Sequence, residues 1–129
     1  MKRLVAALSA VLCSTLIATS AMAAVDFSYS SAQTKDMVRW SDSAESSGTR
    51  WHLTWDVNNS NISSTHRAAI RIYAGPGDYA SALYVYSSYS TSYHNYYSGY
   101  GQGKKNTYIA GRLDNRDSGT LTVKGRFYN

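Results

Sequence analysis

Residues 49–57 read TRWHLTWDV and carry the clearest secondary-structure signal in the chain. Apolar and polar side chains alternate strictly along this stretch, which is the period-two pattern of a half-buried β-strand. The face expected toward the core carries Trp51, Leu53, Trp55 and Val57. The opposite face carries Arg50, His52, Thr54 and Asp56. Because one face is apolar and the other polar, we expect a strand of an antiparallel sheet with one face in water.

Weaker patterns of the same kind predict further short strands on both sides of this one. These strands are expected at residues 25–29, 36–40, 67–74, 79–86, 107–113 and 120–128. No segment shows helical periodicity. Several short strands separated by turn-forming residues are typical of an antiparallel sandwich or barrel. We therefore predict an all-β fold, a small antiparallel β-sandwich of about six to seven strands.

For three of these predicted strands the sequence also predicts a specific arrangement. In residues 79–86, Leu83 and Val85 are expected to face inward, while Tyr84 and Tyr86 face outward. Residues 107–113 and 120–128 are expected to pair as a hairpin, because the connection at 114–119 is rich in turn residues and ends in glycine. Gly125 is expected to mark a bulge in the last strand.

The first 23 residues have the pattern of a bacterial export signal. Lys2 and Arg3 precede an apolar run, and Ala21-Met22-Ala23 has the small-x-small spacing that signal peptidase recognises. The run is too short and interrupted to predict a transmembrane helix. We expect cleavage after Ala23 and a secreted protein of residues 24–129 that forms one β-sandwich domain. Cleavage would remove Cys13, the only cysteine, and would lower the formal net charge from +5 to +3 by removing Lys2 and Arg3.

Residues 79–100 contain eight of the twelve tyrosines, separated mainly by serines. Tyrosine with serine and glycine is typical of recognition surfaces, because the ring offers rigid contact area and the hydroxyl can form hydrogen bonds. Residues 87–105 are expected to form a long loop or an irregular hairpin. We predict an exposed binding surface there, to which an exposed tryptophan could contribute. The candidate binding residues are Tyr84, Tyr86, Tyr89, Tyr93, His94, Tyr96, Tyr97, Tyr100 and Trp40.

The sequence does not contain the residue patterns of the common catalytic and metal sites. His52, His66 and His94 lack zinc-motif spacing, and the expected mature chain has no cysteine. No serine lies in a Gly-x-Ser-x-Gly pattern, and Glu45 is the only glutamate. We therefore expect no catalytic residue, metal, cofactor or nucleic-acid partner.

The run Tyr86-Ser87-Ser88-Tyr89-Ser90-Thr91-Ser92-Tyr93-His94 and the ending Arg126-Phe127-Tyr128-Asn129 resemble the lactococcin 972-like bacteriocins. Members of that family are small, exported, cysteine-free β-sandwich proteins. The resemblance implies antagonism of other bacteria through binding at the cell envelope. We expect the partner to be another secreted protein, a cell-envelope protein or a cell-wall component. Two alternatives stay open, a carbohydrate-binding module and a self-associating structural protein, and a homodimer is compatible with each of them.

Overall fold

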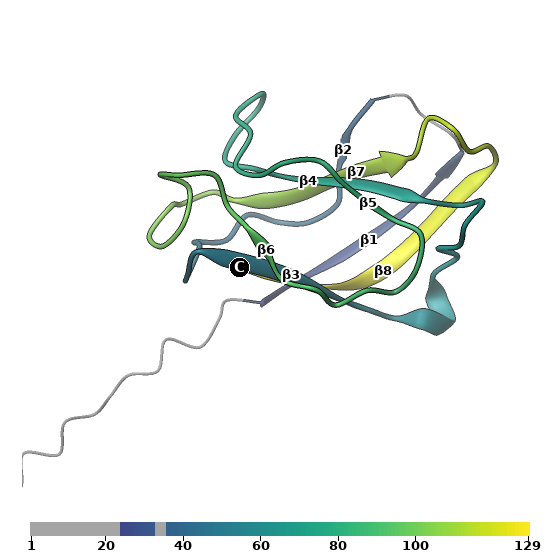
Figure 1. Cartoon of the computed structure of the whole chain (residues 1–129), viewed down its shortest axis with the longest axis horizontal. Helices are drawn as coiled ribbons and strands as arrows, with labels where there is room; N and C mark the ends of the chain where they lie inside the picture. Colours follow the sequence, from purple (N-terminus) through teal and green to yellow (C-terminus); the bar gives the residue numbers. More distant parts are fainter. Residues whose placement is uncertain (1–23, 33–35) are drawn as a thin grey trace, which may run out of the picture.

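The computed structural model describes residues 24–32 and 36–129, so the predicted export signal lies outside the described residues. Eight strands form two four-stranded sheets in which every pairing is antiparallel, as Figure 1 shows. The first sheet has the order β1-β8-β3-β6 and the second β2-β7-β4-β5. The strands are β1 (Ala24–Ala32), β2 (Val38–Arg39), β3 (Arg50–Trp55), β4 (Ala68–Tyr73), β5 (Tyr84–Tyr86), β6 (His94–Asn95), β7 (Tyr108–Leu113) and β8 (Thr120–Tyr128).

The predicted all-β class with antiparallel sheets is confirmed, with eight strands instead of six or seven. The only helical element of the described residues is one turn of 3-10 helix, η1 (Val57–Asn59). None of the helices in the described part of the chain is long and apolar enough to span a bilayer.

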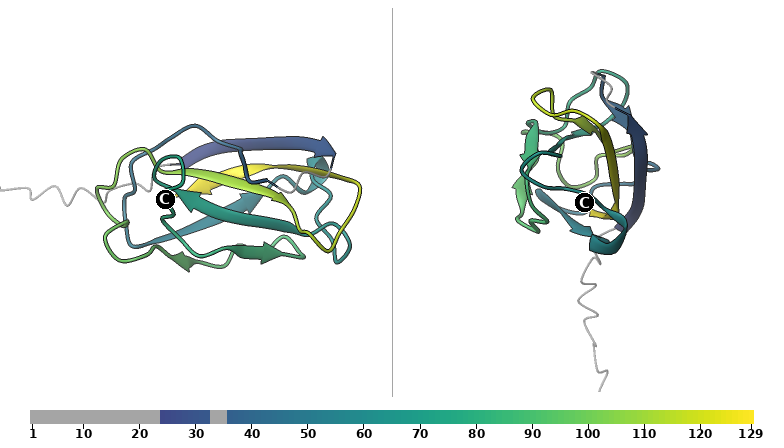
Figure 2. Two further views of the ribbon diagram at one scale, coloured as in Figure 1. Left: turned by 90° about the horizontal axis from the view of Figure 1, so that it is seen from above. Right: turned by 90° about the vertical axis from the view of Figure 1, so that its right-hand side faces the viewer.

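The two sheets lie as two layers, and one hydrophobic core fills the space between them (Figure 2). Alternate residues of the long strands supply this core, as the period-two pattern requires. The fully or almost fully buried side chains include Phe27, Trp51, Leu53, Ile70, Ile72, Ile109, Leu113, Leu121, Val123 and Phe127. Trp51, Leu53 and Trp55 therefore face the core as predicted, although Trp55 is half-buried. Val57 does not, since the strand ends at Trp55 and Val57 lies exposed in η1.

Short segments join the sheets along both of their long sides. On one side, residues 87–93 run from β5 at the edge of the second sheet to β6 at the edge of the first; Figure 1 shows this segment in green. On the other side, β2 pairs with β7, and two residues later Ser41 forms a bridge with Phe27 of β1. Edge strands normally expose unpaired backbone groups. These two connections lie at the edge strands of both sheets: residues 87–93 join β5 to β6, and Ser41 bridges to β1.

The predicted hairpin of the last two strands is wrong. β7 pairs with β4 and β2, whereas β8 pairs with β1 and β3, so the connection between them passes from one sheet to the other. Asp117 fixes this connection by accepting hydrogen bonds from the backbone and guanidinium of Arg67, at 2.7 to 3.0 Å. These bonds lower the pKa of Asp117 to about 2, so its carboxylate is ionised at neutral pH.

The predicted orientation of residues 79–86 is also wrong. Leu83 and Val85 are exposed, while Tyr86 is buried and Tyr84 packs against the core. Alternation identifies two faces but not which of them is buried, and here the phenol rings of Tyr84 and Tyr86 pack against the tryptophans of β3. Regular pairing is limited to β5, with an isolated bridge at Tyr79.

Gly125 allows β1, β8 and β3 to approach each other closely at the middle of the first sheet. It is the register partner of both Phe27 and Trp55, and the pairing on either side is continuous, so no bulge forms there. A Cβ atom at this position would lie 2.9 Å from Cζ of Phe27 and even closer to the carbonyl oxygen of Thr54. The Phe27 ring is buried and the Thr54 oxygen belongs to the backbone, so neither can move away at low cost.

We predict that Gly125→Ala destabilises the protein by about 2 kcal/mol or more, because the added methyl group overpacks a rigid site. Thermal unfolding followed by circular dichroism measures this as a lower Tm. Gly48→Ala is the matched control, since a Cβ there meets no atom within 4 Å. An unchanged Tm in Gly125→Ala would contradict the close approach of the three strands.

Candidate binding surface

The tyrosine-rich stretch is held against the body of the protein by side-chain hydrogen bonds. The indole Nε1 of Trp55 donates to the carbonyl oxygen of Ser90 at 2.9 Å, and the Tyr89 hydroxyl donates to the carbonyl oxygen of Ser60 at 2.8 Å. Tyr100 donates to the carboxylate of Asp78 at 2.5 Å. Residues 87–93 therefore form an ordered crossing segment over one side of the core, not a free loop.

Three of the predicted binding residues are buried, so the expectation that they form an exposed surface is wrong for them. Tyr86, Tyr96 and Trp40 are 5%, 8% and 5% exposed. Tyr86 contacts the ring of Trp55, and Trp40 stacks between Phe27 and Tyr29 at 6.1 and 5.2 Å. Burial raises the pKa of the Tyr86 and Tyr96 phenols well above the ordinary value. These rings belong to the core and its cover.

His94 joins the tyrosine-rich stretch to the core. Its ring centroid lies 3.8 Å from that of Tyr84 and 4.8 Å from that of Trp51. The side chain is half-buried, its Nε2 atom has no hydrogen-bond partner in the described structure, and burial lowers its pKa. The neutral ring is therefore favoured here, because a protonated imidazole would lose hydration without gaining an acceptor.

The remaining predicted residues differ in how much of the ring they expose. Tyr84, Tyr89 and Tyr100 are half-buried, whereas Tyr93 and Tyr97 are 52% and 45% exposed. Only some of the predicted binding residues are therefore exposed to solvent. Of the two most exposed tyrosines, Tyr93 has defined contacts with neighbouring side chains.

Tyr93 belongs to a row of three rings on the outer face of the first sheet, which we call the aromatic row: Tyr93, His52 and Tyr128. The ring centroid of His52 lies 4.4 Å from that of Tyr93 and 4.6 Å from that of Tyr128. The rings of His52 and Tyr128 are nearly parallel, with an interplanar angle of 5°. The guanidinium of Arg50 lies 5.1 Å from the Tyr93 ring centre. Burial lowers the pKa of His52, which favours a neutral ring in the row.

The aromatic row contains two residues that were not among the predicted binding residues, His52 and Tyr128. Both lie on outward positions of their strands and are register partners across β3 and β8. The alternation in residues 49–57 had already placed Arg50 and His52 on the polar face. The proximity of His52 and Tyr128 to Tyr93 depends on the pairing of β3 with β6 and β8, which no local pattern specifies.

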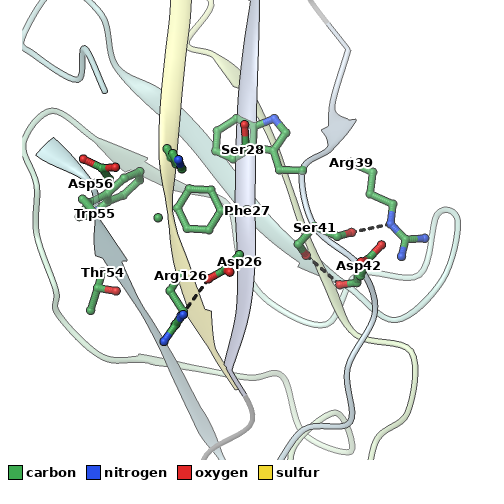
Figure 3. A pocket seen from close by; sticks show the side chains of 13 residues that line it. Asp26, Phe27, Ser28, Arg39, Ser41, Asp42, Thr54, Trp55, Asp56 and Arg126 are labelled. Carbon is green, nitrogen blue, oxygen red and sulfur yellow. Dashed lines mark hydrogen bonds and ion pairs between the residues drawn. The ribbon is translucent and has the colours of Figure 1, made fainter. Parts of the chain in front are cut away.

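A groove of about 750 Å³ crosses the first sheet near Asp26, Arg126 and Asp56, as Figure 3 shows. Three carboxylates and three cationic side chains line it: Asp26, Asp42, Asp56, Arg39, Lys124 and Arg126. Arg126 pairs with Asp26 at 2.9 Å, and Asp56 accepts a hydrogen bond from Asn59 at 2.8 Å. The groove is thus balanced in charge and much of its polar capacity is used within the protein, so it is a weaker candidate than the aromatic row.

Within residues 24–32 and 36–129, no three histidine, cysteine, aspartate or glutamate side chains are placed to hold a metal ion. Comparisons of the chain with protein-family models, with curated proteins and with solved structures found no match.

The lowered pKa values of His94 and His52 predict a loss of stability in mild acid. Below about pH 6.5, His52 and His94 take up protons in the unfolded chain before they do so in the folded protein. The free energy of unfolding therefore falls as the pH drops from about 6.5 toward the folded-state pKa values of these two residues. Asp114 and Asp117, whose pKa values are lowered by arginines, stay ionised over this range. We expect a constant Tm between pH 7 and about pH 9, below the titration of the tyrosines, and a lower Tm at pH 5.

His94→Phe keeps a ring between Trp51 and Tyr84 but removes the proton-binding site. The decrease in Tm between pH 7 and pH 5 should therefore be smaller in this variant than in the wild type. Equal decreases in both proteins would show that His94 is not the group responsible.

Proposed function

We propose that this chain is an exported β-sandwich protein that binds a target at the bacterial cell envelope and catalyses no reaction. It acts in antagonism between bacteria, either alone or as an adaptor of a larger assembly. The sequence of residues 1–23 supports export, and the resemblance to lactococcin 972-like bacteriocins supports the setting.

The single observation that carries the proposal is the aromatic row. Tyr93 exposes half of its surface, yet its ring is held by His52 and by the guanidinium of Arg50. An exposed ring that is already ordered loses little conformational entropy when a partner binds, which is the property of aromatic anchors in recognition surfaces. The neutral His52 and the cationic Arg50 add a hydrogen-bond donor and a charge beside the rings.

A purely binding role is supported by what the acidic residues do. Asp117 and Asp114 contact Arg67 and Arg116, Asp78 accepts from Tyr100, and Asp26 pairs with Arg126. General acid catalysis by a carboxyl group needs a raised pKa, whereas the pKa values of Asp114 and Asp117 are lowered.

The proposal predicts that the purified protein binds isolated cell envelopes of other bacteria and that Tyr93→Ser weakens this binding by about tenfold or more. Co-sedimentation with envelopes measures the binding. Tyr93 is exposed, so the Tm of the variant should stay within a few degrees of the wild type. A growth-inhibition assay with the same two proteins tests whether binding leads to antagonism.

Val57→Ser is the matched control, because Val57 is 55% exposed and lies in η1, outside the aromatic row. This variant should bind as the wild type does. The proposal fails if the wild type neither binds envelopes nor inhibits growth, or if Tyr93→Ser and Val57→Ser bind equally well.

A further inference from the structure

The outer face of the second sheet carries a second organised surface, in the upper layer of Figure 1. We call it the arginine–tyrosine face and define it as Arg39, Arg71, Tyr73, Tyr79 and Tyr108. None of its residues was among the predicted binding residues, and none belongs to the aromatic row. The five side chains come from β2, β4 and β7 and from the bridge at Tyr79.

The tyrosines form one row across the sheet and the arginines form the next. Tyr73 is the register partner of both Tyr108 and Tyr79; its ring stacks on Tyr108 at 5.6 Å and meets Tyr79 edge to face at 5.2 Å. Two residues along, Ala110 is the register partner of both Arg39 and Arg71. Two strand spacings therefore separate the arginines, about 10 Å between their Cα atoms.

Each arginine is positioned by a tyrosine ring beneath it. The guanidinium of Arg71 lies 4.1 Å from the ring centre of Tyr79, and that of Arg39 lies 4.4 Å from the ring centre of Tyr108. Arg39 also donates to the carbonyl oxygen of Ser41 at 2.7 Å and to the Ser43 hydroxyl at 2.9 Å. Such cation–π contacts orient a guanidinium without neutralising its charge.

The ion pairs of the described residues do not neutralise the charge on this face. Those pairs use Arg67, Arg116 and Arg126, and neither Arg39 nor Arg71 takes part in any of them. Two oriented guanidinium groups on one sheet face are suited to planar anions such as carboxylates, which a guanidinium can bind with two parallel hydrogen bonds. Leu83 and Val85 continue the face at its β5 edge and are exposed, so an apolar strip borders the cations.

We propose that the arginine–tyrosine face binds an acidic polysaccharide, a chain of sugars that carry carboxylate groups. Arg39 and Arg71 bind carboxylates of two different sugars in the chain, since they stand two strands apart. Tyr79, Leu83 and Val85 contact the C–H faces of the sugar rings. This surface goes beyond the proposed function, because it lies on the opposite sheet and uses none of the residues of the aromatic row.

The test measures binding of the purified protein to polygalacturonate by isothermal titration calorimetry. Arg71→Gln and Arg39→Gln should each weaken binding by about tenfold, because each removes one bidentate, charge-assisted contact. Arg71→Lys keeps the charge but not the planar fork and should lose most of the same affinity. Arg39 is exposed, so Arg39→Gln carries the test if Arg71→Gln lowers the Tm.

Lys105→Gln is the matched control, because it removes the same charge from an exposed position outside the face. It should change the affinity by less than about twofold, as expected for a distant exposed charge. Fully methyl-esterified polygalacturonate, which has the same sugar chain without charge, should bind much more weakly.

Three results would overturn the proposal. Equal losses in Lys105→Gln and the arginine variants would indicate attraction by net charge alone. Binding of poly-glutamate as tight as that of polygalacturonate would assign the face to acidic proteins. Loss of binding in Tyr93→Ser but not in the arginine variants would move the site to the aromatic row, so failure here is distinguishable from failure of the proposed function.

Discussion

Trp51 packs between the two sheets and contacts aromatic side chains from three other strands, β5, β6 and β8. It stands on β3 of the first sheet and is fully buried. Its ring meets Phe127 of β8, Tyr84 of β5 in the second sheet, and His94 of β6, at centroid distances of 4.8 to 6.2 Å. Because Tyr84 and His94 lie at the two ends of the crossing segment, the same ring that joins the sheets also fixes where that segment begins and ends. Tyr93 directly precedes His94, so the pairing of His94 with Trp51 also places Tyr93 on the outer face of the first sheet.

The sequence predicted the all-β class and the inward face of β3, because strict alternation with tryptophan and leucine on one side fits a half-buried strand and does not fit a helix. It failed for residues 79–86, where tyrosines alternate with leucine and valine and both faces are apolar enough to be buried. It also failed for the connection between β7 and β8. A turn-rich segment that ends in glycine suits a hairpin, but here Asp117 binds Arg67, fifty residues away in the chain. Contacts at that separation leave no trace in a local pattern.

The candidate surfaces show the same limit. Tyr93 was identified from composition alone, but His52 and Tyr128 join it only because β3 lies between β6 and β8. Part of the arginine–tyrosine face follows from the alternation along β4, which places Arg71 and Tyr73 on the same side of the sheet. Arg39 and Tyr108 lie beside them only because β7 pairs with both β2 and β4. Strand order therefore decides which polar residues become neighbours, and it is the part of a β-fold that sequence periodicity does not contain.

The pairing of β1 with β8 has a consequence for how the molecule assembles. These are the first and the last strands of the described chain, yet they form an uninterrupted ladder from Ala24 with Tyr128 to Ala32 with Thr120. During synthesis β1 lacks its ladder partner until residues 120–128 emerge, so the first sheet cannot be completed before then. Contacts between distant residues also slow folding, because closing a long loop costs conformational entropy before the contacts that stabilise it can form. We therefore expect closure of the β1–β8 ladder to be a late step in folding.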